Sequence, residues 1–201
     1  MVTKEDDADG FLESRDAAEQ EKTLIASAGT NKTAFERLMK PHLPVVYQYL
    51  KAHAPNEADA EDILQETMLS CWKSISAFRG TSGFRTWLMG IARHKLADYY
   101  RDQYGRNYFS TVDLFDPELP DTADGQAERK IEQVSEAIDI ERAKEGLSAQ
   151  DKELLFLVFD AQLSYTEIET VTGIPSGTVK SRIYTIKGKL RPLLAEGRAD
   201  K

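Results

Sequence analysis

The stretch that decides the fold of this chain is LSYTEIETVTGIPSGTVKSRI, residues 163–183. Ser164 and Glu167 stand at the spacing of a capping box, which predicts the start of a helix. Gly173 ends that helix, and Pro175 suits the first turn of a second one. The stretch therefore predicts a helix-turn-helix, two helices joined by a tight turn.

The second helix of this motif carries different residues on its two faces. Apolar residues recur at steps of four, three and four, which predicts a buried stripe of Val179, Ile183, Ile186 and Leu190. The opposite face is polar and basic, and it comprises Ser176, Thr178, Lys180, Ser181, Arg182, Tyr184 and Thr185. A recognition helix presents such side chains to base edges and phosphates in the major groove of DNA.

A surface hairpin whose lysines and arginines are only solvated is the alternative interpretation. The capping box, glycine turn, proline and basic face occur in the order that DNA-binding motifs require, and this order favours DNA binding. Because many classes of DNA-binding protein use the motif, the rest of the chain must indicate which class this is.

The composition is that of an ordinary soluble protein, with 201 residues, 41% of them hydrophobic and 30% charged. No apolar run approaches membrane-spanning length, and the N-terminus is acidic where a secretory signal would be basic and then apolar. We therefore expect a cytoplasmic chain without membrane insertion. The single cysteine, Cys71, is expected in the core, and the three histidines lack zinc-site spacing, so we expect no metal and no cofactor.

Charge is strongly segregated along the chain, whose net charge is -8. Residues 1–22 hold eight acidic and three basic residues, and residues 113–145 hold eleven acidic and four basic ones. By contrast, residues 79–106 carry six Arg or Lys against two Asp, and residues 180–191 carry five basic residues and no acidic one. Two basic surfaces are therefore expected, and local field matters more to phosphate binding than total charge.

The pattern predicts an all-α fold with two helical domains joined by a flexible acidic linker, the C-terminal domain containing the helix-turn-helix. The expected parts are an acidic tail at 1–22, a first domain at 23–104, the linker at 105–130 and a second domain at 131–201.

Local signals place some of the helices. Helical spacing runs from Phe35 to Tyr49, Pro55 closes that unit, and the next helix is expected to begin near Asp59. In the second domain, Ser148 is expected to cap a helix that packs under the helix-turn-helix.

The helix expected from about Asp59 onward also has two unlike faces. Its predicted buried stripe is Ala60, Ile63, Leu64, Met68, Cys71, Trp72 and Ile75. Its other face holds Asp59, Asp62, Gln65, Glu66 and Leu69. An acidic surface with an apolar residue suits docking on a basic protein surface, and a solvated helix face fits the same pattern equally well.

Residues 78–101 interleave aromatic and basic side chains. Flat rings stack on unpaired bases while cations follow the backbone, so this composition is typical of binding to unstacked nucleic acid. Because aromatic residues at helical spacing are more often core, we assign Trp87, Leu88, Ile91 and Leu96 mainly to packing. The nucleic-acid surface is then expected from the loop Arg79 to Arg85 and from the helix face that carries His94.

Taken in order, these motifs resemble those of bacterial sigma-70-type transcription initiation factors, in the extracytoplasmic-function group. The sequence AEDILQE (60–66) is similar to that family's helix for the core polymerase clamp. FRG (78–80) followed by FRTWL (84–88) is similar to its promoter-melting segment, and residues 163–182 are similar to its minus-35 domain. Together these cover most of residues 23–194.

The resemblance implies a specificity subunit without an active site. Its clamp-binding residues would be Asp62, Gln65, Glu66 and Leu69. Its minus-10 residues would be Phe78, Arg79, Phe84, Arg85 and His94, and the polar face of the second motif helix would read the minus-35 element. The implied partners are core RNA polymerase, promoter DNA and an inhibitory anti-sigma factor.

Three positions depart from the family pattern. Family members usually carry Asn where His94 stands, and many carry Arg where Thr185 falls. Glu169 replaces a usual Ala in the helix before the turn. We therefore expect the minus-10 base preference and the minus-35 contacts of this chain to differ from those of its relatives.

Two other functions stay open at this point. A helix-turn-helix repressor or activator would bind duplex operators as a dimer, but it leaves the aromatic and basic segment unexplained. An all-helical nucleotide pyrophosphohydrolase could hold magnesium with Glu61, Asp62 and Glu66, but it needs a second acidic helix facing the first.

Overall fold

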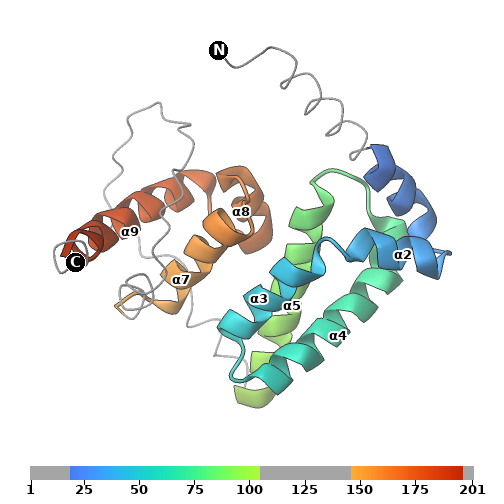
Figure 1. Cartoon of the computed structure of the whole chain (residues 1–201), viewed down its shortest axis with the longest axis horizontal. Helices are drawn as coiled ribbons and strands as arrows, with labels where there is room; N and C mark the ends of the chain where they lie inside the picture. The colour runs from blue at the N-terminus through green and yellow to red at the C-terminus, as the bar shows by residue number, and fades with distance from the viewer. Residues whose placement is uncertain (1–18, 105–145, 197–201) are drawn as a thin grey trace, which may run out of the picture. The chain divides into compact units, whose positions relative to one another are not determined.

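The computed structural model describes residues 19–104 and 146–196, and the chain divides at Tyr99–Tyr100 into two compact units (Figure 1). All regular structure in these two ranges is helical, so the prediction of an all-α fold with two helical domains is confirmed. The expected linker at 105–130 and most of the expected tail lie outside the described residues. Residues 19–28 form a helix, which therefore begins before the expected boundary at residue 23.

The first unit gathers its helices around one core. Its elements after the helix at 19–28 are α2 (Lys32–Met39), α3 (Leu43–His53), α4 (Glu57–Ser74), the 3-10 turn η1 (Ile75–Ala77) and most of α5 (Phe84–Tyr104). Helices α3 and α4 pack side by side, as Figure 1 shows. At the turn between them, Tyr47 Oη and Lys51 Nζ of α3 both donate to Glu57 Oε1 of α4, at 2.8 and 2.7 Å.

Two helix boundaries differ from the sequence prediction. The helical spacing from Phe35 to Tyr49 is divided between α2 and α3, because Pro41 has no N–H and cannot continue a helix. Helix α4 begins at Glu57, ahead of Asp59, because Asn56 caps it: Asn56 Oδ1 accepts from the Asp59 amide at 2.9 Å.

The predicted buried stripe of α4 is only partly correct. Ala60, Ile63, Cys71 and Ile75 are buried, whereas Leu64, Met68 and Trp72 are half-buried. Thr67 completes the stripe, and its hydroxyl donates to the Ile63 carbonyl at 2.8 Å, which satisfies the buried polar group. Burial raises the pKa of the Cys71 thiol to about 12, so Cys71 is a core residue, as predicted.

The second unit contains α7 (Ala149–Leu155), the π-helical turn η2 (Phe156–Asp160), α8 (Tyr165–Thr172) and α9 (Ser176–Glu196). Helix α9 packs against both α7 and α8. Val179, Ile183 and Ile186 are almost fully buried, which confirms most of the predicted stripe. Each such side chain contributes about 1.5–3 kcal/mol when fully buried, so this stripe stabilises the packing of α9 on its neighbours.

The long, strongly apolar helix that a membrane span requires does not occur in the described parts of the chain.

Candidate nucleic-acid interface

The turn between α8 and α9 has its backbone N–H groups satisfied by residues of α8. The capping box that starts α8 is present, because Ser164 Oγ accepts from the Glu167 amide and the Glu167 carboxylate accepts from the Ser164 amide. Gly173 ends α8 with φ +78°, a left-handed conformation that glycine adopts without strain.

Three donor groups of this turn find acceptors at short distances. The Gly173 amide donates to the Glu169 carbonyl at 2.8 Å, and the Ile174 amide donates to Thr172 Oγ1 at 3.1 Å. The Ser176 amide donates to Glu169 Oε2 at 3.0 Å. Pro175 has no N–H, so every backbone N–H group from Gly173 to Ser176 has an acceptor. These hydrogen bonds hold the turn in one geometry, which fixes the direction in which α9 leaves α8.

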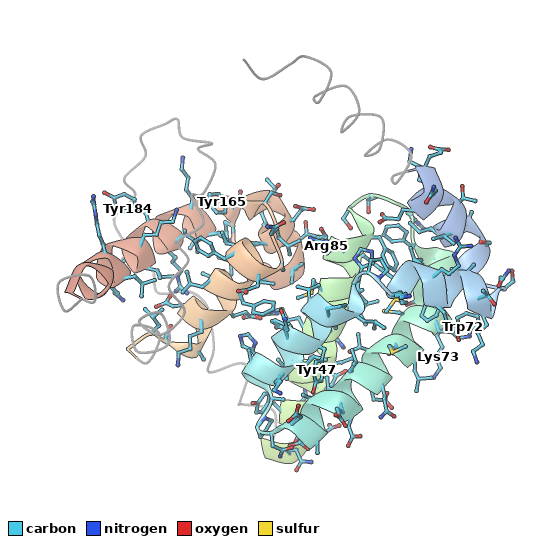
Figure 2. All side chains as sticks on the ribbon, viewed as in Figure 1. Tyr47, Trp72, Lys73, Arg85, Tyr165 and Tyr184 are labelled. Atoms are coloured by element: carbon cyan, nitrogen blue, oxygen red, sulfur yellow. The ribbon has the colours of Figure 1, made fainter. Side chains whose placement is uncertain are left out.

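The predicted DNA-facing residues of α9 lie on its accessible side. Lys180 is exposed, and Tyr184, with 78% of its surface exposed, points into solvent on the outer side of α9 (Figure 2). The others are half-buried: Ser176, Thr178, Ser181, Arg182 and Thr185. The hydroxyls of Ser181 and Thr185 donate to carbonyls of the preceding turn of α9, at 3.0 and 3.1 Å.

Arg182 differs from the other cation on this surface because a neighbouring helix holds it. Its Nη1 donates to Gln150 Oε1 of α7 at 2.9 Å. No local sequence pattern indicates this pair, since 32 residues separate the two partners. The contact orients the guanidinium before any ligand arrives.

The acidic face predicted for α4 is present and open to solvent. Asp62, Gln65 and Glu66 are exposed, and 51% of the surface of Leu69 is exposed beside them. Lys95 of α5 lies 4.0 Å from Glu66 at the edge of this face, too far for a strong ion pair. The face therefore offers negative charge beside an apolar contact.

An aromatic cluster supports the segment between α4 and α5. The Phe78 ring lies 5.1 Å from the Trp87 ring and 5.9 Å from the Phe84 ring, measured between centroids. Phe78 and Trp87 are half-buried, so part of each ring is accessible, and Arg79 beside them is exposed. Gly80 has φ +66°, which lets the chain turn sharply after Phe78 and Arg79.

The structure corrects the place of Phe84. The sequence put it among residues that contact nucleic acid, but only 2% of its surface is exposed. Its ring packs against His42 at 5.2 Å and Trp87 at 5.7 Å. Phe84 is the first residue of α5 and turns inward, so its contribution is to hold Phe78 and Trp87 in place. The core of α5 is otherwise Leu88, Met89, Ala92 and Leu96, while Ile91 is half-buried.

His94 lies on the open face of α5, with 70% of its side chain exposed. Its Nδ1 is 3.1 Å from Asp98 Oδ2, one helical turn further along. Since the carboxylate can only accept, Nδ1 carries the hydrogen in this pair, and Nε2 is the ring atom left to meet a ligand. Arg85, labelled in Figure 2, lies half-buried at the N-terminal end of the same helix.

Behind this surface lies His42, whose buried imidazole has no hydrogen-bond partner among the described residues. Burial lowers the pKa of His42, and the Arg85 guanidinium lowers it further. Glu21 Oε2 lies 3.7 Å from His42 Nε2, which would favour the charged form. That distance is beyond a hydrogen bond and the carboxylate is partly solvated, so burial is the stronger effect.

The magnesium alternative finds no support in the part of the chain that the structure describes. Within residues 19–104 and 146–196, no group of three or more His, Cys, Asp or Glu side chains is placed to share a metal ion. Glu61, Asp62 and Glu66 are exposed on α4 and form no such group there.

The structure therefore brings the predicted residues together as two sets on the first unit and one on the second. One face of α4 carries Asp62, Gln65, Glu66 and Leu69. On the second unit, the predicted DNA-facing residues lie on the accessible side of α9. The sequence patterns did not predict three supporting contacts, which are made by Asp98, Gln150 and the carboxylate of Glu169. Only Asp98 had a local signal, its helical spacing of four from His94.

Comparison with known protein families identifies both parts of the chain. The family model described as Sigma-70 region 2 matches residues 38–106, and the one described as Sigma-70, region 4 matches residues 137–190. These matches fall in that order along the sequence and together span more than half of it.

Curated relatives are similar over almost their full length. RNA polymerase sigma factor NccH of Alcaligenes xylosoxydans xylosoxydans is 27% identical, over 89% of this chain and 96% of the relative. ECF RNA polymerase sigma factor SigC of Mycobacterium tuberculosis is 30% identical, over 83% of this chain and 86% of the relative.

Solved structures share the fold. CnrH, determined in complex with the cytosolic domain of CnrY, is 22% identical with a TM-score of 0.61, over 88% of this chain and 98% of that one. The sigma factor RpoE, determined in complex with the anti-sigma factor NepR from Bartonella quintana, is 24% identical with a TM-score of 0.58, over 80% of this chain and 96% of that one.

Proposed function

We propose that this chain, which belongs to the sigma-70 family of RNA polymerase sigma factors in the extracytoplasmic-function group, initiates transcription through three surfaces on its two units. As a sigma factor it binds core RNA polymerase and directs it to promoters. In this proposal residues 23–104 form the region 2 domain, residues 131–201 form the region 4 domain, and residues 105–130 join them.

The first surface is the acidic face of α4, which docks on the polymerase. Asp62, Gln65 and Glu66 supply negative charge that steers the chain toward a basic partner, and Leu69 supplies the apolar contact that holds it there. The exposure of Leu69 supports this role, because it places an apolar side chain within the acidic face where a partner can bury it.

The second surface is the polar face of α9, which reads the minus-35 element in the major groove. Its residues are Ser176, Thr178, Lys180, Ser181, Arg182, Tyr184 and Thr185. The turn held by Glu169 and Gly173 fixes the angle at which this helix enters the groove.

The third surface is the loop before α5 together with the first half of that helix, which traps the melted minus-10 element. Phe78 offers a ring for stacking, Arg79 and Arg85 offer charge for the backbone, and His94 offers a ring nitrogen to a flipped base. Stacking on an aromatic side chain is worth about 1–3 kcal/mol per base. Unstacking a base costs a few kcal/mol. One stacked ring together with charge contacts therefore offsets the unstacking of one base without hydrolysis of a nucleotide.

Two consequences follow from this assignment. RNA synthesis belongs to the polymerase, so the chain needs no catalytic residue and works in the cytoplasm, where the polymerase meets the chromosome. Since two solved relatives were determined with CnrY and with the anti-sigma factor NepR, we expect an anti-sigma factor to cover these surfaces in the resting cell.

The observation that carries the proposal is the position of the first and third surfaces on one folded unit. The acidic face of α4 and the aromatic and basic start of α5 are separated by only a short loop. A duplex-binding repressor has no use for either surface.

The test is transcription in vitro from genomic fragments by core polymerase, with and without this protein. We expect new start sites preceded by a shared pair of elements. The absence of any start site dependent on the protein would reject the proposal. Binding to duplex operators with equal affinity in the absence of polymerase would favour the repressor instead.

A further inference from the structure

Glu169 places a carboxylate at the N-terminal end of the recognition helix α9. It lies on α8, is exposed, and its Oε2 accepts from the amide of Ser176, the first residue of α9, at 3.0 Å. Its own backbone carbonyl accepts from Gly173 at 2.8 Å. The residue is therefore held at both its backbone and its side chain, and the carboxylate has a defined position.

This carboxylate extends the face of α9 that is open to solvent. Ser176, Lys180 and Tyr184 stand four residues apart, so they follow one side of the helix at intervals of about 6 Å. In a helix-turn-helix, the N-terminal residues of the second helix come closest to the base edges. A group bound to the Ser176 amide enters the groove together with that end of the helix.

The chemistry of a carboxylate then limits which base it can meet. It accepts hydrogen bonds and donates none. In the major groove, cytosine and adenine offer exocyclic amines as donors, whereas guanine and thymine present acceptors at the corresponding edge. A negative charge at this point also repels the phosphates, so a backbone contact is disfavoured there.

We propose that Glu169 is a specificity-determining residue of minus-35 recognition, which selects cytosine or adenine at one position on the strand that it faces. The inference rests on the proposed function, in which α9 reads this element. A single hydrogen-bonded base contact at the weaker end of the usual range gives about 5- to 10-fold discrimination.

The experiment uses a promoter found in the genomic transcription assay, with its minus-35 element randomised and transcribed by core polymerase with the full chain. The wild type should prefer C or A over G and T at one position by about 5- to 10-fold. Glu169→Ala should remove the preference at that position, and it also removes the contact that holds the Ser176 amide. Glu169→Gln keeps an acceptor for that amide, so it tests the preference with the turn intact. Glu169→Gln should narrow it to adenine, because an amide pairs with both adenine edge atoms.

A charge-matched control separates position from net charge. The double variant Glu169→Ala with Thr170→Glu keeps the charge but moves the carboxylate to the next exposed position of α8. It should behave like Glu169→Ala, and recovery of the wild-type preference would reject the inference. Native helicity and an unchanged melting temperature of Glu169→Gln keep the comparison free of folding effects.

Two outcomes distinguish a failure of this inference from a failure of the proposed function. A wild-type preference profile that Glu169→Ala leaves unchanged would overturn the role of Glu169 while α9 remains the reader. A wild-type profile without preference at any minus-35 position would overturn both.

Discussion

At the scale of single residues, Lys180 and Arg182 should make different contacts with DNA although both are basic. Arg182 is half-buried and oriented by Gln150, so little side-chain freedom remains for it to lose on meeting a base. Lys180 is exposed and unrestrained in this way, which suits a point charge on a phosphate. The hydrogen bond from Arg182 to Gln150 of α7, more than the charge, is what distinguishes the expected base contact of Arg182 from the expected phosphate contact of Lys180.

Arg182→Ala should weaken minus-35 binding by about 1–3 kcal/mol and relax the preference at one base pair. Lys180→Ala should weaken binding to all sequences alike and lower the slope of log K against log salt by about 1. Fluorescence anisotropy with minus-35 duplexes at several salt concentrations measures both. Lys73→Ala, which removes an exposed cation of the first unit, is the control and should change neither quantity. Equal salt slopes for the two α9 variants would contradict the division.

His42 should make the stability of the first unit depend on pH. Its pKa in the folded protein is lowered from 6.5 by burial and by Arg85, so the unfolded chain binds the proton more readily. The stability it confers is therefore complete above about pH 6.5 and is lost as the pH falls toward the folded pKa. Glu21, the facing carboxylate, reduces the effect without reversing it.

Urea denaturation at pH 7.5 and pH 5 measures this dependence. His42→Phe keeps an aromatic ring against Phe84 and removes the titrating nitrogens, so the loss of stability between the two pH values should be smaller than in the wild type. An equal loss in both proteins would show that other groups, and not His42, govern the acid response.

At the scale of elements, α4 is stabilised by one face and is expected to function through the other. Its buried residues Ala60, Ile63 and Cys71 hold it in the first unit, whereas Asp62 on the opposite face is exposed to solvent. Charge reversal on the exposed face should therefore leave folding intact.

Asp62→Lys should weaken binding to core polymerase at least about tenfold, because like charges brought together cost several kcal/mol. A pull-down or light-scattering titration with core enzyme gives the affinity. Glu36→Lys makes the same change of charge on α2 and should bind normally. Native affinity of Asp62→Lys, with native helicity, would rule out the docking face.

An element can be predicted from the sequence when the residues that stabilise it lie close together along the chain. Ser164, Glu167 and Gly173 act on atoms within a few residues, so the sequence alone located α8 and its turn. The pair Gln150–Arg182 depends on the packing of α7 on α9, which no local pattern contains. Phe78 and Phe84 have the same chemistry, and only the start of α5 turns one inward and leaves the other half-exposed.

The break between α2 and α3 shows a different limit. Apolar residues keep helical spacing from Phe35 to Tyr49, so periodicity alone indicated one helix. Pro41 outweighs that periodicity, because a missing N–H and a steric clash together cost about 3 kcal/mol in a helix interior. A backbone rule therefore takes precedence over a hydrophobic pattern here.

At the scale of the whole molecule, a net charge of -8 is compatible with DNA binding because the charge is divided by region. The five basic residues within 180–191 lie on α9, and no acidic residue dilutes them in that range. The two units have separate cores, so the surfaces proposed for minus-10 and minus-35 DNA do not share a supporting residue.

This separation predicts that changes at the two DNA surfaces combine independently. His94 presents only Nε2, since Asp98 holds Nδ1, whereas an asparagine presents a donor and an acceptor together. His94→Asn should therefore shift the minus-10 base preference and leave the minus-35 preference unchanged, while Arg182→Ala should do the reverse.

In the double variant the two losses of promoter binding free energy should add to within about 0.3–0.5 kcal/mol, as for sites with no shared partner. Open-complex titrations on one promoter, with all four proteins, measure the cycle. A coupling energy above that range would show that the two surfaces act as one, and unchanged minus-10 preference in His94→Asn would remove His94 from the promoter surface.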